Sequence, residues 1–305
     1  MVLGPCCALH QHGATCGARR TAHYTDSSSA DATRTQSAAV VLGFSVPVVF
    51  PAGLARSVRT ARTIAVVPAR YQSSRLPGKP LALIGGQTMI EHVCRRAAEA
   101  RRVDAVVVAT DDERIANAVD AFGGTAVMTS DAHLSGTDRL AEVAAHLEGE
   151  IVVNVQGDEP MISPDAIDAV VALVERRTDT GMGTLRKRVT DPADADNPAV
   201  VKLVVDANGN ALYFSRAPIP FTRPGHPVPP VWRHLGLYAY RREFLLRVAA
   251  LAPTPLERAE GLEQLRVLEH GLEIATVETT ADTIGVDTPE DLERVRRLIE
   301  AGVPH

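Results

Sequence analysis

Short apolar segments that alternate with helical segments constrain the fold of this chain most. Residues 64–67, 105–109, 126–128 and 151–155 carry no charged side chain, and each is too short for an ordinary helix. A strand that is apolar on both faces must be covered on both faces. The pattern therefore predicts an α/β fold with a mainly parallel sheet and helices on both faces.

The segments between these strands have a helical period. We predict helices over residues 89–100, 112–122, 135–147, 164–175, 242–250, 257–270 and 289–301, and a last strand over 274–277. Ser163 before Pro164 and Thr288 before Pro289 are typical of helix starts, because a hydroxyl caps the first turn and proline suits its first position.

The chain divides into a leader and one main domain. Residues 1–60 contain no lysine or glutamate and no sustained helical period, so we expect a disordered leader or sequence upstream of the native start. A targeting role is the alternative. Residues 61–305 form the main domain. Predicted strands at 184–189, 200–205, 211–214 and 235–240 indicate a β-rich insertion over about 184–240, which we expect to mediate dimerisation.

Charge and apolar pattern exclude several classes of protein. The net charge is −5, and the main domain is more acidic than the whole because the leader holds five basic residues against two acidic ones. An acidic body argues against general nucleic-acid binding. The apolar stretch at 38–54 is interrupted by glycine and proline and does not suit a membrane span. The four cysteines offer the main domain neither a disulfide framework nor zinc-ligand spacing.

A basic loop directly follows the first predicted strand. Residues 68–80 hold Arg70, Ser73, Arg75 and Lys79 together with one glycine and three prolines. Such cations need an anion, and a polyphosphate suits them. Gly78-Lys79 is followed by Pro80, so the loop is not a Walker A motif. A solvated basic turn is the alternative, but a loop at the end of a buried strand is where α/β sheets place ligands.

Two acidic segments lie at predicted strand ends. Asp158 follows the strand at 151–155, and Asp287 precedes the helix at 289–301. Either residue alone is also typical of a turn or a helix cap. Together with the basic loop they could converge on one sheet edge, where Mg²⁺-assisted phosphoryl chemistry needs carboxylate ligands and phosphate-binding cations.

The ordered motifs resemble the 3-deoxy-manno-octulosonate cytidylyltransferase family, over about residues 63–300. They are PARYQSSRLPGKP at 68–80, SGTDR at 135–139, NVQGDEP at 154–160, YFSR at 213–216, RHLGLY at 233–238 and GVDTPED at 285–291. The first motif alone would suit several sugar nucleotidyltransferases, whereas the ordered set is specific.

The resemblance implies a Rossmann-like nucleotidyltransferase fold in a cytoplasmic homodimer. It implies transfer of CMP from CTP to 3-deoxy-D-manno-octulosonate (Kdo), which releases pyrophosphate and activates Kdo for lipopolysaccharide synthesis. The match to the family's motifs implies phosphate and nucleoside contacts from Arg70, Ser73, Arg75, Lys79 and Gln156, with Arg70 and Lys79 also catalytic. It further implies Mg²⁺ ligation by catalytic Asp158 and Asp287, and Kdo contacts from Arg216, His234, Glu263 and Gln264.

Other interpretations stay open from the sequence. Glu263 and Gln264 could belong to a solvated helix face, and His234 could be a satisfied histidine between strands. The substrate could be a sialic acid, on which another cytidylyltransferase of the same fold would act. It could also be an 8-amino analogue of Kdo, because only the protein partner of a single hydroxyl group would distinguish that analogue from Kdo. A non-catalytic nucleotide-binding subunit is the alternative from another class, although it need not keep both Asp158 and Asp287.

Overall fold

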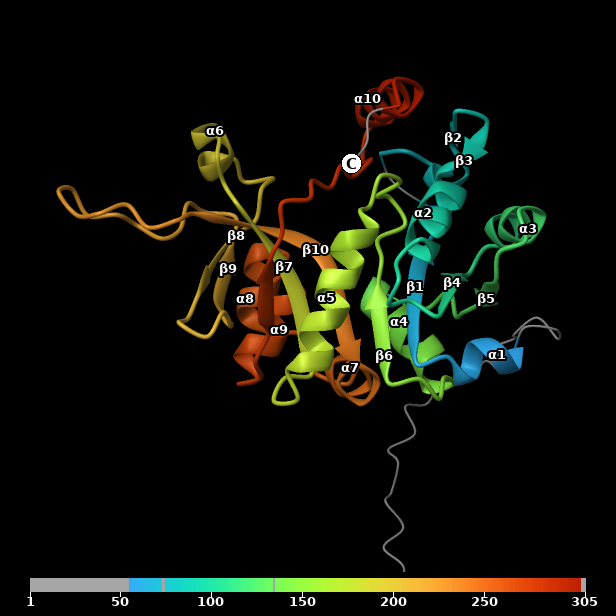
Figure 1. Cartoon of the computed structure of the whole chain (residues 1–305), viewed down its shortest axis with the longest axis horizontal. Coiled ribbons are helices and arrows are strands. Elements are labelled where there is room, and N and C mark those ends of the chain that lie inside the picture. Colours follow the sequence, from blue (N-terminus) through green and yellow to red (C-terminus); the bar gives the residue numbers. More distant parts are fainter. Residues whose placement is uncertain (1–54, 73–74, 134, 303–305) are drawn as a thin grey trace, which may run out of the picture. The chain divides into compact units, whose positions relative to one another are not determined.

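The computed structural model describes residues 55–72, 75–133 and 135–302 (Figure 1). The predictions for residues 1–54 and for Ser73 lie outside the described residues. Helix α1 (Ala55–Thr60) falls within the predicted leader. Its Val58 is buried in one of the apolar cores. The described fold thus begins before residue 61, where the sequence analysis placed the start of the main domain.

A nine-stranded sheet organises the described part of the chain (Figure 1). Its main path runs β11-β7-β10-β6-β1-β4-β5, and the β8–β9 hairpin is attached to β10. Within the main path β10 alone is antiparallel to its neighbours. The strands are β1 (Thr63–Ala69), β4 (Ala105–Thr110), β5 (Ala126–Met128), β6 (Ile151–Asn154), β7 (Met182–Arg188), β8 (Lys202–Val205), β9 (Ala211–Ser215), β10 (Trp232–Arg241) and β11 (Ala275–Glu278).

Helices cover both faces of this sheet, as predicted. Their bounds are α2 (Met89–Ala98), α3 (Glu113–Ala121), α4 (Gly136–Ala145), α5 (Pro164–Arg176), α6 (Pro192–Asp196), α7 (Arg242–Ala249), α8 (Pro255–Glu260), α9 (Gln264–Glu269) and α10 (Pro289–Glu300). A short 3₁₀ helix, η1 (Lys79–Leu81), and a small β2–β3 hairpin (Leu83–Ile84, Gln87–Thr88) follow β1. None of the helices in the described ranges is long and apolar enough to span a membrane.

The alternation of side chains along β1 explains the two layers. Ala65 and Val67 pack into a core shared with α2, α3 and α5. Ile64 and Val66 point to the other face, into a core shared with α1, α4, α7 and α9. Because successive residues of a strand face opposite sides, a wholly apolar strand requires both layers.

Two sequence predictions differ from the structure in detail. The strands of the predicted β-rich insertion belong to the main sheet, because β7 and β10 lie inside it and β8 and β9 extend it. The predicted helix over 257–270 is two helices, α8 and α9. They are separated at Gly261, whose φ of 62° is a left-handed conformation that ends α8.

A third apolar cluster holds the C-terminal helix near the carboxyl ends of the parallel strands. Val286, Leu292 and Val295 pack with Ile84 of β2 and Met161, which follows β6. This packing brings the segment before α10 to the loops that follow β1 and β6. It therefore places the last motif of the chain beside the first one.

Candidate active site

The basic loop is shaped around Arg70 at the end of β1. Arg70 Nη2 donates to the carbonyl oxygens of His133 at 2.6 Å and Ser135 at 3.2 Å. Both carbonyls lie just before α4, which Ser135 caps. Among the described residues, Nε and Nη1 of Arg70 have no hydrogen-bond partner, so they are available to an anion.

The two acidic segments meet through their backbones. Val286 N donates to Asp158 O at 2.9 Å, which fixes the segment before α10 against the loop after β6. Lys79 Nζ lies 2.8 Å from Asp158 Oδ2 and 3.2 Å from Asp287 Oδ1. Arg75 Nη2 lies 3.2 Å from Asp287 Oδ2. The predicted convergence of the basic loop and both aspartates on one sheet edge is confirmed, while their roles stay predictions.

A cavity of about 360 Å³ opens between the basic loop and the loop after β6. Cations from the basic loop line one side, and the loop after β6 supplies Gln156 and Asp158. The lining residues are Pro68, Ala69, Arg70, Gln72, Arg75, Lys79, Pro80, Gln156, Gly157 and Asp158. Three cations against one carboxylate in this lining favour a polyanionic ligand.

The same carboxylates suit a magnesium ion. The single Nζ atom of Lys79 lies within 3.2 Å of carboxylate oxygens from both Asp158 and Asp287, so one cation can contact both side chains. In the described ranges, no group of three or more His, Cys, Asp or Glu side chains could hold a metal ion. Two carboxylates suffice for Mg²⁺ when substrate phosphates complete its shell, so these residues fit that ion.

Gly157 allows the loop after β6 to approach β1. A Cβ atom at this position would lie 2.7 Å from the carbonyl oxygen of Pro68 and 3.5 Å from Val67 Cγ1. A backbone oxygen within a buried strand cannot move away easily. The absence of a side chain at 157 therefore sets the distance between Gln156, Asp158 and the basic loop.

Glu159, next to Asp158, is buried at the base of this loop. Burial, reinforced by the charge of Asp158, raises the pKa of the Glu159 carboxyl to about 8. Glu159 is therefore mainly protonated at neutral pH and adds little negative charge beside Asp158.

A second cavity of about 250 Å³ adjoins the first, because Gln156 lines both. It lies between α4, β6, β10 and the α8–α9 region. The lining residues are Gly136, Thr137, Asn154, Gln156, Met182, Gly236, Tyr238, Tyr240, Val248, Gly261, Leu262, Glu263, Gln264, Arg266 and Val267. Its hydroxyl, amide and carboxylate groups suit a polyhydroxylated ligand.

The structure does not support the alternative in which Glu263 and Gln264 belong to a solvated helix face. Glu263 precedes α9 and accepts a hydrogen bond from Thr137 Oγ1 at 2.7 Å, while Gln264 is buried. Both residues line the second cavity. Their position is compatible with the predicted sugar contacts.

Arg216 lies beside the second cavity rather than on its wall. Arg216 Nε donates to Glu260 O at 2.8 Å, and Nη1 donates to Pro198 O at 3.1 Å. Glu260 is followed directly by Gly261 and Leu262 of the cavity lining. A sugar-acid contact by Arg216 stays a prediction.

His234 is held between strands. Its Nε2 lies 3.0 Å from Thr184 Oγ1, and its ring makes an edge contact with Phe214 at 5.0 Å between centroids. Burial lowers the pKa of the His234 imidazole to about 3, so the ring is neutral at physiological pH. The geometry favours the satisfied-histidine interpretation, and a sugar contact by His234 stays a prediction.

Several residues of the second cavity had no role predicted from the sequence, although Gly236 and Tyr238 lie in the RHLGLY motif. Gly236, Tyr238 and Tyr240 line it from alternate positions of β10. Their spacing of two is the signal that could have found them, because residues two apart share one face of a strand. Thr137 was part of a quoted motif but had no assigned role.

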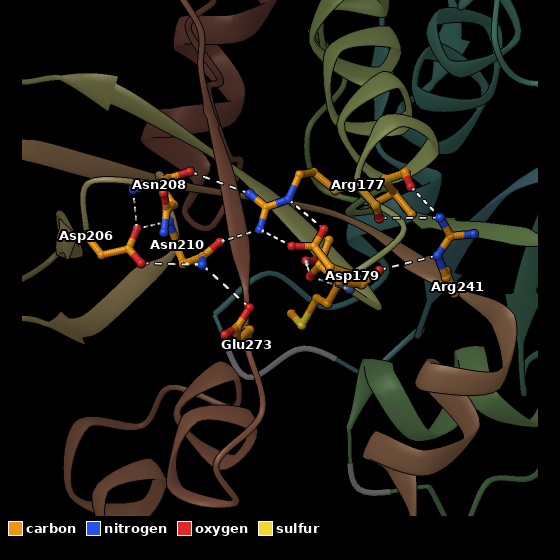
Figure 2. A network of polar contacts seen from close by, with 10 residues as sticks. Arg177, Asp179, Asp206, Asn208, Asn210, Arg241 and Glu273 are labelled. Carbon is orange, nitrogen blue, oxygen red and sulfur yellow. Dashed lines mark hydrogen bonds and ion pairs between the residues drawn. The ribbon is translucent and has the colours of Figure 1, made fainter.

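A different cavity and polar network lie at the opposite edge of the sheet, where the parallel strands begin. A cavity of about 870 Å³ lies there, lined by the loops that precede β6, β7 and β11 and by the start of α7. Figure 2 shows the polar network beside it, in which Arg177 joins Asp179 and Asn210, and Asn210 joins Asp206 and Glu273. None of the predicted site residues in the described ranges lines this cavity.

Comparison with known proteins agrees with these features. The cytidylyltransferase family model matches residues 64–274. The 3-deoxy-manno-octulosonate cytidylyltransferase of Solibacter usitatus is 52% identical over 242 residues, which cover 79% of this chain and 96% of the relative. The enzyme of the same name from Myxococcus xanthus is 54% identical over 246 residues, covering 80% and 99%.

Two solved structures are similar to this chain, one in sequence and fold and the other in fold alone. A CMP:2-keto-3-deoxy-manno-octonic acid synthetase complexed with CTP superposes with a TM-score of 0.76 at 46% identity, covering 79% of this chain and all of that one. A 4-diphosphocytidyl-2C-methyl-D-erythritol synthase from Anaerococcus prevotii, at 13% identity and a TM-score of 0.53, covers 78% of this chain and 99% of its own and shows the fold alone. The chain belongs to the 3-deoxy-manno-octulosonate cytidylyltransferase family.

Proposed function

We propose that this chain transfers CMP from CTP to Kdo and releases pyrophosphate. The observation that carries the proposal is that Lys79, which lines a cationic cavity together with Asp158, also contacts Asp287. This cavity adjoins a second, polar cavity through Gln156. The first cavity suits a triphosphate and the second suits a sugar acid. The names of the relatives support this pairing of substrates.

The basic loop would hold the triphosphate. Arg70, Arg75 and Lys79 line the cavity and can donate to phosphate oxygens, and Ser73 lies in the same sequence motif. Cations fixed before the reaction stabilise the negative charge that gathers on the departing pyrophosphate. Gln156 lies between the two cavities and would contact the nucleotide there.

Asp158 and Asp287 would hold Mg²⁺. When bound, the ion neutralises phosphate charge and lowers the barrier to displacement of pyrophosphate. The two carboxylates come from segments that the Val286–Asp158 backbone hydrogen bond fixes, so their separation is set before any ligand binds. That preorganisation lowers the cost of binding.

The second cavity would hold Kdo. Glu263 and Gln264 can bond its hydroxyls, and Arg216 can bond its carboxylate through Nη2, which has no hydrogen-bond partner among the described residues. His234 is neutral, so we propose that it contacts the sugar by hydrogen bonding without charge pairing, although Thr184 already occupies its Nε2.

A pyrophosphate assay tests the proposed function. With CTP and Mg²⁺, the protein is expected to release pyrophosphate only when Kdo is added. A sialic acid and the 8-amino analogue of Kdo serve as alternative acceptors in parallel reactions. Release that does not depend on Kdo, or a preference for another acceptor, would contradict the proposal.

We extend the proposal to the wider setting of the reaction. CMP-Kdo is an activated donor, because its phosphate linkage makes CMP a good leaving group when the sugar is transferred onward. We therefore place the chain in the activation of Kdo for lipopolysaccharide synthesis, with the cytoplasm as its compartment.

We also propose that the protein acts as a homodimer. The loop between β9 and β10 projects from the sheet (Figure 1) and carries Phe221, 85% exposed, and Val228, 77% exposed. Large apolar side chains exposed together are typical of an interaction surface. This loop belongs to the predicted β-rich insertion, which supports that region as the dimer contact.

Analytical ultracentrifugation tests the dimer. The wild-type protein is expected to sediment as a dimer at micromolar concentration, and Phe221→Asp combined with Val228→Asp is expected to yield monomers, because burying a carboxylate is costly. Leu83→Asp is the control, since Leu83 is 56% exposed outside this loop. A monomeric wild type, or a doubly substituted variant that stays dimeric, would exclude this contact.

A further inference from the structure

Lysine is rare in this chain, and one of its lysines is fully buried outside the site described above. Of the 32 basic residues only Lys79, Lys187 and Lys202 are lysines. Lys79 joins the two aspartates of the active site, and Lys187 pairs with Asp282. Lys202, on β8, is fully buried at 0% exposure. A chain whose basic residues are mostly arginine thus has an ammonium group where solvent cannot reach it.

The surroundings of Lys202 explain the choice of an ammonium group. Lys202 Nζ donates to the carbonyl oxygens of Asn197 at 2.8 Å, Val200 at 2.7 Å and Arg216 at 2.6 Å. Three acceptors thus converge on one nitrogen atom, whose three N–H groups they satisfy. A planar guanidinium spreads its donors over three nitrogen atoms and cannot reproduce this arrangement.

Through these three carbonyls, Lys202 fixes both the backbone of Arg216 and the segment around Pro198, which the guanidinium of Arg216 contacts. Lys202 binds the backbone of Arg216 itself, and it also binds Asn197 and Val200 on either side of Pro198. Pro198 O in turn accepts from Arg216 Nη1 at 3.1 Å. The buried ammonium therefore sets both the base of the Arg216 side chain and the carbonyl against which its guanidinium rests.

Glu260 completes the support from the other side. Its carboxylate accepts from Arg216 N at 3.0 Å and from Ser215 Oγ at 2.6 Å, and its carbonyl accepts from Arg216 Nε at 2.8 Å. Since Glu260 leads directly into the wall of the second cavity, Arg216 is fixed relative to that cavity.

We propose that Lys202 is a positioning residue for sugar-acid binding, because it holds the guanidinium of Arg216 at the second cavity. The proposal rests on the proposed contact of Arg216 with the Kdo carboxylate. It assigns Lys202 no contact with either substrate. Loss of the ammonium group should therefore weaken Kdo binding and leave CTP binding intact.

Steady-state kinetics of Lys202→Met test this role. The KM for Kdo is expected to rise about tenfold, the loss expected when one charge-assisted hydrogen bond is misplaced. The KM for CTP is expected to stay within about twofold, since the hydrogen-bond partners of Lys202 among the described residues all lie outside the basic loop. If Lys202→Met does not fold, Lys202→Arg is measured instead, with the same expected separation of the two KM values.

Arg241→Met is a matched control for the loss of a cation that donates to three backbone carbonyls. The guanidinium of Arg241 also donates to three carbonyls, those of Val174, Arg177 and Thr180, but at the opposite edge of the sheet (Figure 2). Arg241→Met is expected to lower the thermal unfolding temperature without a selective rise in the KM for Kdo. If Arg241→Met raised the KM for Kdo as selectively as Lys202→Met does, the effect of Lys202→Met would reflect general destabilisation, and the positioning role would be overturned.

A double-mutant cycle with Arg216→Ala separates the possible failures. Arg216→Ala alone is expected to raise the KM for Kdo, and adding Lys202→Met is expected to raise it little further. If Arg216→Ala has no effect on that KM, the proposed role of Arg216 fails. If Arg216→Ala raises it and Lys202→Met does not, or if the two effects multiply, the positioning role of Lys202 is overturned.

Discussion

Replacing Asp287 by Asn is expected to lower kcat by about 10²- to 10³-fold, the range for losing one preorganised group that stabilises transition-state charge. Asn keeps the size of the side chain but removes the charge that Lys79 and Arg75 contact in the free protein. The same charge is one of the two proposed Mg²⁺ ligands. Asp158→Asn is expected to act in the same direction, since Asp158 supplies the other carboxylate.

Folding should survive the change at Asp287. Its side chain is 48% exposed, so its ion pairs are partly screened by water and contribute about 1 kcal/mol or less to the free energy of unfolding. Asp282→Asn is the matched control, because Asp282 is 59% exposed and pairs with Lys187 at 2.6 Å. Steady-state rates at saturating CTP and Kdo provide the measurement. Similar rates for Asp287→Asn and Asp282→Asn would remove Asp287 from catalysis.

Substitution of Gly157 by Ala is expected to damage both activity and stability. The new Cβ would lie 2.7 Å from Pro68 O, which is too close for any unstrained contact, so either β1 or the loop after β6 must move. Overpacking of this kind costs about 1–3 kcal/mol in the free energy of unfolding. Displacement of Gln156 and Asp158 from the basic loop is expected to lower kcat/KM by about 10²-fold, as small misplacements of catalytic groups do.

Gly285→Ala provides the control for this substitution. Gly285 lies two residues before Asp287, and a Cβ added there would meet nothing within 4 Å. Thermal unfolding and kcat/KM of the two variants, measured together, separate steric displacement from a general effect of losing glycine. Near-normal kcat/KM for Gly157→Ala would show that the close approach of this loop to β1 is not required.

Much of the sheet could be predicted because its strands are apolar on both faces. The segments at 64–67, 105–109 and 151–155 correspond to β1, β4 and β6. Their parallel arrangement places the loops after β1 and β6 on the same edge, which is why Arg70 and Asp158 could be assigned to one site from the sequence.

Other features depend on tertiary contacts that leave no local pattern. The break between α8 and α9 was hidden because the helical period continues on both sides of Gly261. The position of Asp287 depends on the backbone bond from Val286 to Asp158, between segments far apart in the sequence. From the sequence, Lys202 is an ordinary cation in a predicted strand. Its special position depends on three carbonyl partners that only the structure shows.

A crystal structure with CTP and Mg²⁺ tests the central claim most directly, namely that the basic loop and the two aspartates form the nucleotide site. The triphosphate is expected in the cavity lined by Arg70, Arg75 and Lys79, with a metal ion contacted by carboxylate oxygens of Asp158 and Asp287. A nucleotide bound elsewhere, for example in the cavity beside Arg241 at the opposite sheet edge, or a metal ion without contact to either aspartate, would contradict it.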